Sequence, residues 1–100
     1  MNRSDFFKSL DSDECPDMEN SCLQSLWYDY QGEWSRAHDL VQDMDEPIAK
    51  WVHAYLHRKE GDIWNADYWY RRAGLKRPDT TLDEEWHEIV NTLLDDERGH

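Results

Sequence analysis

Apolar residues along this chain recur at intervals of three and four, the spacing that places them on one face of an α-helix. The first such segment contains Leu23, Leu26, Trp27 and Tyr30, and four later segments repeat the spacing. No stretch shows the sustained alternation of apolar and polar positions that predicts a half-buried β-strand. We therefore predict an all-α chain, with helices over approximately residues 19–30, 34–43, 47–60, 62–74 and from 81 onward.

Residues that favour helix ends lie at the boundaries of these segments. Gly32 and Gly61 each follow an apolar run, at the place where glycine commonly ends a helix. Pro47 fits the first turn of the third helix, because its missing N–H has no helical partner there anyway. Thr81 and Glu84 have the spacing of a capping box, in which each side chain bonds the other's backbone N–H. The end signals and the apolar pattern thus predict the same helices.

A turn sequence occurs twice, and the second copy begins 29 positions after the first. The copy from Gly32 to Ala37 and the copy from Gly61 to Ala66 hold glycine and alanine at the same places. A repeat of this period is typical of one supersecondary unit stacked on itself. The chain is therefore predicted to be a tandem of helical hairpins that share one core and one groove.

The second copy of the turn resembles the second half of a tetratricopeptide repeat. The resemblance is carried by Gly61, Ala66, Tyr70, Ala73 and Pro78. The run 65–74 also resembles the related Sel-type repeats, and 51–74 resembles a set of small bacterial proteins from which no function follows. The resemblance implies a two-hairpin solenoid with the fifth helix as a C-terminal cap. It also implies that the two alanines let the helices of a hairpin approach closely.

Residues 1–16 are predicted to be a flexible acidic segment, followed by a single helical domain over residues 17–98. Phe6, Phe7 and Leu10 leave open an alternative, in which one amphipathic turn of this segment docks on the domain.

The net charge of −12 limits the classes of partner. Nucleic acids and anionic membranes are poor partners, because binding either needs clustered lysine and arginine. The charge favours solubility or attraction to a basic partner. The thirteen aromatic residues are more than five short helices usually bury, so we expect partial exposure of some of Trp27, Trp34, Trp64 and Trp69.

Cys15 and Cys22 are the only cysteines. Their spacing matches no zinc or redox motif. The first residues lack the apolar run of a signal peptide, and no segment reaches the length of a membrane span. We therefore expect a cytoplasmic protein with reduced thiols.

One face of the third predicted helix carries His53, His57 and Glu60 at spacings of four and three residues. Together with Lys50, the two histidines depart from the tetratricopeptide template, which has small and apolar residues along this helix. Two histidines at this spacing can chelate zinc with the glutamate as third ligand. We favour instead packing of both imidazoles against residues 68–70 with local hydrogen bonds, and after that a polar ligand pocket. We assign no metal ion.

The fourth predicted helix ends in a cluster of basic residues, Arg71, Arg72, Lys76 and Arg77. Such a cluster complements the helix dipole. It can also pair with Glu84, Glu85 and Glu88, or bind a carboxylate or phosphate. The candidate ligand-binding residues are His53, His57, Arg58, Asp62, Asn65, Tyr68, Arg71 and Arg72.

These observations favour a non-enzymatic protein-interaction module of the tetratricopeptide type, with no cofactor and no catalytic residue. The expected partner is a basic or amphipathic protein or peptide, and pairing of two copies is an alternative occupant of the same surface. The competing hypothesis is a small-molecule or metal-binding protein that uses a pocket between the third and fourth predicted helices.

Overall fold

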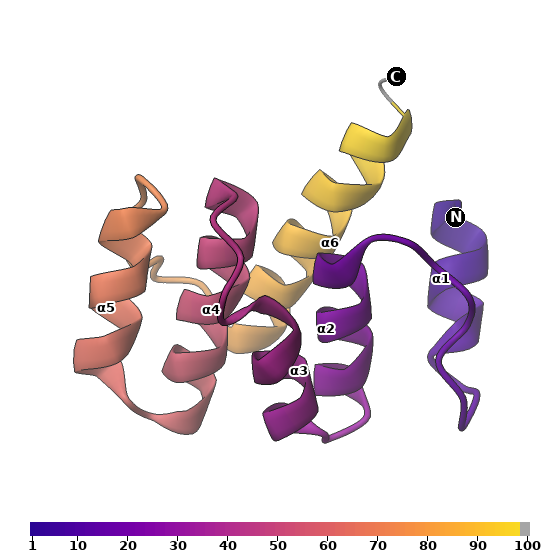
Figure 1. Ribbon diagram of the computed structural model, residues 1–100, viewed down its shortest axis with the longest axis horizontal. Coiled ribbons are helices and arrows are strands. Elements are labelled where there is room, and N and C mark those ends of the chain that lie inside the picture. Colours follow the sequence, from indigo (N-terminus) through magenta and orange to yellow (C-terminus); the bar gives the residue numbers. More distant parts are fainter. Residues whose placement is uncertain (99–100) are drawn as a thin grey trace.

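The computed structural model describes residues 1–98, in which all regular secondary structure is helical (Figure 1). The prediction of an all-α chain is thereby confirmed, and the predicted third helix coincides with α4. No helix in this described part of the chain combines the length and the apolar character needed to cross a membrane. The helices are α1 (Arg3–Ser9), α2 (Ser21–Tyr30), α3 (Trp34–Val41), α4 (Pro47–Glu60), α5 (Ile63–Arg72) and α6 (Leu82–Arg98).

The two copies of the repeated turn have the same backbone geometry. Gly32 lies at φ 85° and Gly61 at φ 88°, a region that favours glycine because it has no Cβ. Each turn also closes with the same hydrogen bond, from Glu33 N to Tyr28 O at 2.9 Å and from Asp62 N to His57 O at 3.0 Å. The turns therefore fold α2 back on α3 and α4 back on α5, as Figure 1 shows.

The helices of each hairpin approach closely at a small residue. Ala66 of α5 is fully buried and packs against Ala54 of α4. At the corresponding place in the first hairpin, Ser25 Oγ donates a hydrogen bond to Ala37 O at 2.7 Å. Ala73, for which we expected the same role as Ala66, forms the C-cap of α5 and is only half-buried.

A leucine in place of Ala66 is expected to lower the free energy of unfolding by about 1–3 kcal/mol, because the contact with Ala54 leaves no room for it. Asp67→Ala is the control, since it removes only a partly exposed ion pair with Arg77 and should cost less than about 1 kcal/mol. Thermal melting compares the two, at roughly 4–8 °C per kcal/mol for a domain of this size. Equal melting temperatures would mean that Ala66 does not face α4.

Helix α4 is the centre of the fold, with contacts to α2, α3, α5 and α6. In Figure 1, α6 crosses behind α4 and α2 instead of continuing the row of helices beyond α5. Its capping box forms as predicted, with Thr81 Oγ1 and Glu84 Oε1 each 3.0 Å from the other residue's backbone nitrogen. Trp86 at its start donates to Leu26 O of α2 at 3.1 Å. The fifth predicted helix thus covers the face shared by α2 and α4.

Part of the segment that we expected to be flexible forms helix α1, which docks on the rest of the molecule. Phe6 is 0% exposed, and its ring lies 6.2 Å from that of Trp86 in α6. Arg3 donates to Asn91 and Asp95 of α6, each at 3.2 Å. The docked turn suggested by Phe6 and Leu10 is therefore present, with Asn2 as its N-cap.

Candidate functional site

Three histidines meet between the two hairpins. His53 and His57 lie one turn apart on α4, with ring centroids 4.8 Å apart, and His38 reaches them from α3. The His38 ring centroid is 4.7 Å from that of His53 and 5.2 Å from that of His57. His38 Nε2 and His53 Nε2 are 3.0 Å apart, so that one imidazole donates a hydrogen bond to the other. Figure 1 shows α3 next to α4, and the two helices are in contact.

Two tryptophans cover the rings of this histidine cluster, which we define as His38, His53 and His57. Trp69 of α5 stacks on His53 at 4.0 Å, and Trp34 of α3 stacks on His38 at 4.9 Å. Trp34 is itself held by a hydrogen bond from its indole N–H to the backbone oxygen of residue 56 at 2.8 Å. The tryptophans fix the planes of the imidazoles and limit the access of water.

Burial in the histidine cluster favours the neutral form of His53 and of His38. His53 is 4% exposed, and its burial, with the neighbouring His38 and His57, lowers its pKa to about 3. Burial and the proximity of His57 also lower the pKa of His38. Glu60 Oε1 lies 2.6 Å from His57 Nδ1 and so accepts a hydrogen bond from this ring. Neutral imidazole is the form that binds metal ions.

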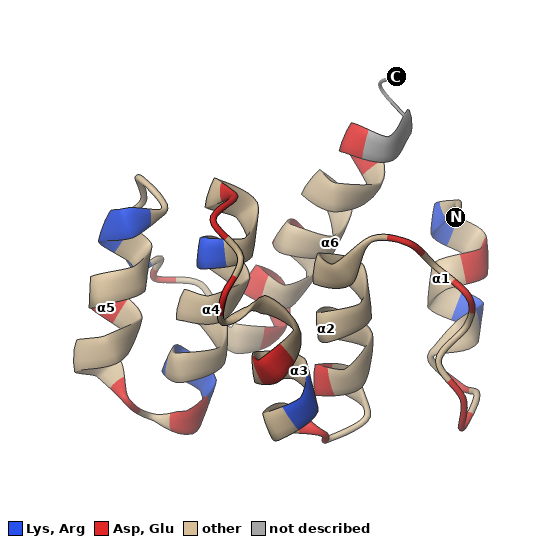
Figure 2. Ribbon diagram, viewed as in Figure 1, with Lys and Arg blue, Asp and Glu red and all other residues tan. Residues whose placement is uncertain are grey.

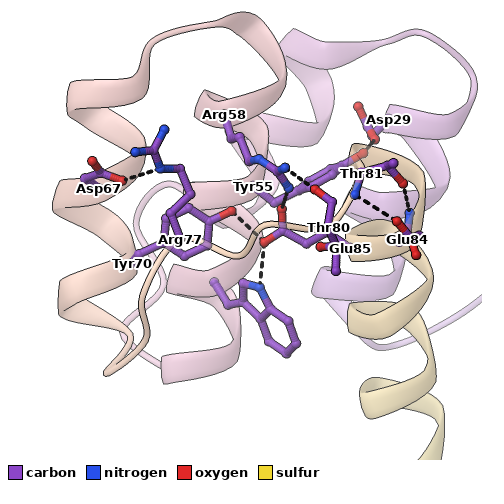
Figure 3. A network of polar contacts seen from close by, with 11 residues as sticks. Asp29, Tyr55, Arg58, Asp67, Tyr70, Arg77, Thr80, Thr81, Glu84 and Glu85 are labelled. Carbon is purple, nitrogen blue, oxygen red and sulfur yellow. Dashed lines mark hydrogen bonds and ion pairs between the residues drawn. The ribbon is translucent and has the colours of Figure 1, made fainter.

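Arg58, another predicted site residue, belongs to a separate buried network (Figure 3). Its guanidinium donates to Glu85 Oε1 of α6 at 2.7 Å and also to Thr80 O. Glu85 accepts two further hydrogen bonds, from Trp51 Nε1 at 3.0 Å and from Tyr70 OH at 2.5 Å. Although burial opposes the charge of Arg58, its contact with Glu85 keeps the guanidinium pKa raised. The network joins α4, α5 and α6.

A second buried acid lies beside this network. Asp29 accepts hydrogen bonds from Tyr55 OH and Lys59 Nζ, both at 2.8 Å. Burial and the carboxylate of Asp29 raise the pKa of Tyr55, which therefore stays a neutral donor. These contacts tie α2 to α4 and leave Asp29 with two partners, which is what a buried carboxylate needs.

Asp62 and Asn65 form the N-terminal cap of α5. Asp62 accepts from the Asn65 side chain at 2.9 Å and from its backbone nitrogen at 3.2 Å. These hydrogen bonds lower the pKa of Asp62. Both residues therefore have a structural role at the turn between α4 and α5.

Tyr68 and Arg72 lie on the outer face of α5. Trp64 is 76% exposed on this face, and its ring stacks on Tyr68 at 6.4 Å. The Arg72 guanidinium lies 5.5 Å from the Tyr68 ring centroid and 5.3 Å from that of Trp69. Of the tryptophans for which we expected partial exposure, Trp64 is exposed and Trp34 and Trp69 are half-buried, whereas Trp27 is buried.

Arg71 points to a different surface, where it lines a shallow cavity with Asp67, Tyr70, Leu75, Lys76 and Arg77. Arg77 pairs with Asp67 at 3.1 Å, and Glu85 pairs with Arg58. The ion pair between Arg77 and Glu85, one of those that we considered for the basic cluster, is therefore not formed.

The predicted site residues are thus distributed over several places. The structure brings His53 and His57 together but places Arg58 in the Glu85 network, Asp62 and Asn65 at the cap, and the rest on two surfaces. Trp69 lies in the run 68–70 against which we expected the imidazoles to pack, but sequence reasoning missed His38 and Trp34. Their signal was weak: Trp34 and His38 share the spacing of four residues that His53 and His57 show, but on another helix.

Comparisons with protein-family models, with curated proteins and with solved structures found no match to this chain.

Proposed function

We propose that this chain is a non-enzymatic protein-interaction module of the tetratricopeptide type. The observation that carries the proposal is the outer face of α5, where Trp64 and Tyr68 are exposed one helical turn apart. Tryptophan, tyrosine and arginine are the residues that most often dominate binding energy at protein interfaces. Arg72, which lies over the Tyr68 ring, adds the third of these types. We call Trp64, Tyr68 and Arg72 the α5 aromatic face.

The repeated turn supports the solenoid part of the proposal. Two hairpins with the same glycine conformation and the same closing hydrogen bond follow one another along the chain. In this arrangement α6 is the closing helix, and it covers the side of the stack formed by α2 and α4. The outer side of α5 is then the end of the stack at which a further helix can pack.

The partner that fits this face is an amphipathic helix or peptide with net positive charge. Its apolar side would cover Trp64 and Tyr68, which bury large areas when a partner excludes water. The net charge of −12 would attract its basic side over a distance. Figure 2 shows acidic residues at the turn between α4 and α5, next to the start of the α5 aromatic face. A second copy of the chain is the other occupant that an experiment must distinguish.

A photo-crosslinking residue at position 64 tests the proposal, with the same residue at the exposed position 88 of α6 as the matched control. We expect adducts from position 64 and none from position 88. Mass spectrometry should identify the cross-linked segment of the partner as amphipathic and basic. A synthetic peptide of that segment should bind the unmodified chain and lose most of its affinity for the Trp64→Ser variant. Removal of this exposed side chain should change the free energy of unfolding by no more than about 0.5 kcal/mol.

The same adducts from both positions would contradict the proposal, because binding would then not depend on the α5 aromatic face. An adduct of twice the mass of the chain would show that the partner at this face is a second copy of the chain and not a basic peptide. Peptide binding that Trp64→Ser leaves unchanged would also count against this surface.

A further inference from the structure

The histidine cluster has the composition and the spacing of a metal site. His38, His53 and His57 each offer a ring nitrogen, and these atoms all lie within 4.8 Å of one another. We propose that the three imidazoles bind a single divalent transition-metal ion of the zinc type. The proposal is independent of the interaction function, since it uses none of the residues of the α5 aromatic face.

The distances fit tetrahedral coordination after a small adjustment. Zinc binds histidine nitrogen at about 2.0–2.1 Å, so two nitrogens on a tetrahedral ion lie roughly 3.3–3.4 Å apart. His38 Nε2 and His53 Nε2 are already 3.0 Å apart. Both nitrogens need a lone pair to bind the ion, so the ring that donates in the metal-free chain moves its proton to Nδ1. The ligand nitrogen of His57 lies within 4.8 Å of those of His38 and His53 and has to come closer for the three to bind one ion.

Glu60 supplies an arrangement that is common around metal-bound histidines. It accepts a hydrogen bond from His57 Nδ1 at 2.6 Å, which leaves the lone pair on Nε2 of the same ring. Carboxylates in this position fix the tautomer and raise the basicity of the ligand. Trp69 stacks on His53, and Trp34 stacks on His38, so these two imidazoles are already ordered before an ion binds.

The ligand set selects the class of metal. Imidazole nitrogens suit zinc, copper and nickel, whereas calcium and magnesium prefer oxygen. A second group of candidate ligands, His57, Glu60 and Asp62, shares only His57 with the histidine cluster. Asp62 already caps α5 through Asn65, so the three histidines are the better set. Three protein ligands leave a fourth position for water, and half-buried His38 gives it access to solvent.

Titration of the chelator-treated full chain with Co²⁺ and with Zn²⁺ tests the site. Four-coordinate Co²⁺ has strong visible absorption bands, so we expect them to grow to saturation at one equivalent and to disappear when Zn²⁺ displaces the cobalt. Zn²⁺ should also raise the melting temperature, because it binds the folded chain. A spectrum of hydrated Co²⁺ only, with no saturation at one equivalent, would overturn the proposal.

Two variants assign the ligands. His38→Phe keeps a ring to stack on Trp34 but has no ligand atom, and we expect Zn²⁺ affinity to fall on the order of 100-fold or more. Glu60→Gln should weaken binding by about 10–100-fold through His57 alone. His87→Phe, on α6 and outside the histidine cluster, is the matched control and should bind as the unmodified chain does.

Unchanged affinity in His38→Phe, or an equal loss in His87→Phe, would overturn the assignment. Circular dichroism shows whether each variant keeps its helices. Should His38→Phe unfold, Glu60→Gln decides, since unchanged affinity in a folded Glu60→Gln chain would contradict the role of His57.

Discussion

Replacement of Glu85 by alanine is expected to lower the free energy of unfolding by about 3–5 kcal/mol, because it leaves the Arg58 side chain, only 15% exposed, without its counter-charge. Glu85 is 0% exposed and bonds Arg58, Trp51 and Tyr70, as Figure 3 shows for its labelled partners. A domain of this size usually has about 5–15 kcal/mol of stability in total. The variant should therefore unfold at a much lower urea concentration, as followed by far-ultraviolet circular dichroism.

Glu88→Ala is the matched control, since Glu88 is an exposed acid one turn further along α6, and its loss should change stability by no more than about 0.5 kcal/mol. A second comparison separates charge from packing. The double variant Arg58→Met, Glu85→Leu should be more stable than Glu85→Ala, because buried ion pairs can often be replaced by apolar residues of similar volume. Similar effects of Glu85→Ala and Glu88→Ala would show that the buried pair contributes little.

Phe6→Ala is the second change for which we expect a large effect, with a loss of about 3–5 kcal/mol for a fully buried aromatic side chain. Phe6 fills the space between α1 and Trp86, and its removal leaves a cavity or releases α1 altogether. Thermal melting should show a decrease that corresponds to this loss, at roughly 4–8 °C per kcal/mol.

Lys8→Ala, an exposed position in the same helix, controls for changes in helix propensity and should have little effect. Near-equal melting temperatures for Phe6→Ala and Lys8→Ala would contradict the docking of α1. The comparison also tests the flexible N-terminal segment that the sequence alone suggested.

Local patterns were sufficient to predict the helices of residues 17–98. Gly61, Pro47 and the capping box at Thr81 act through their own backbone and near neighbours, so their effect can be read without a tertiary structure. The position of α6 could not be read in this way, because Trp86 contacts Phe6 and Leu26, which are distant in the sequence. The docking of α1 depends on the same long-range contacts.

The candidate site shows the same division. His53 and His57 were predicted to share a face because they lie on one helix, whereas His38 joins them only when α3 packs on α4. Glu85 lies in an acidic first turn that is typical of an exposed helix start. Its spacing of four from Ile89 does place it on the buried side of α6, but its partner Arg58 comes from α4.

The contacts between α1 and α6 also determine the order in which the chain can complete its fold during synthesis. The hairpins α2–α3 and α4–α5 are closed by short turns, so each can form soon after it leaves the ribosome. Helix α1 is made before all of them, yet Phe6 and Arg3 pack on Trp86, Asn91 and Asp95. The contacts of α1 with α6 can therefore form only after α6 has been translated, whereas its hydrogen bonds from Trp27 and Gln31 at the end of α2 can form earlier.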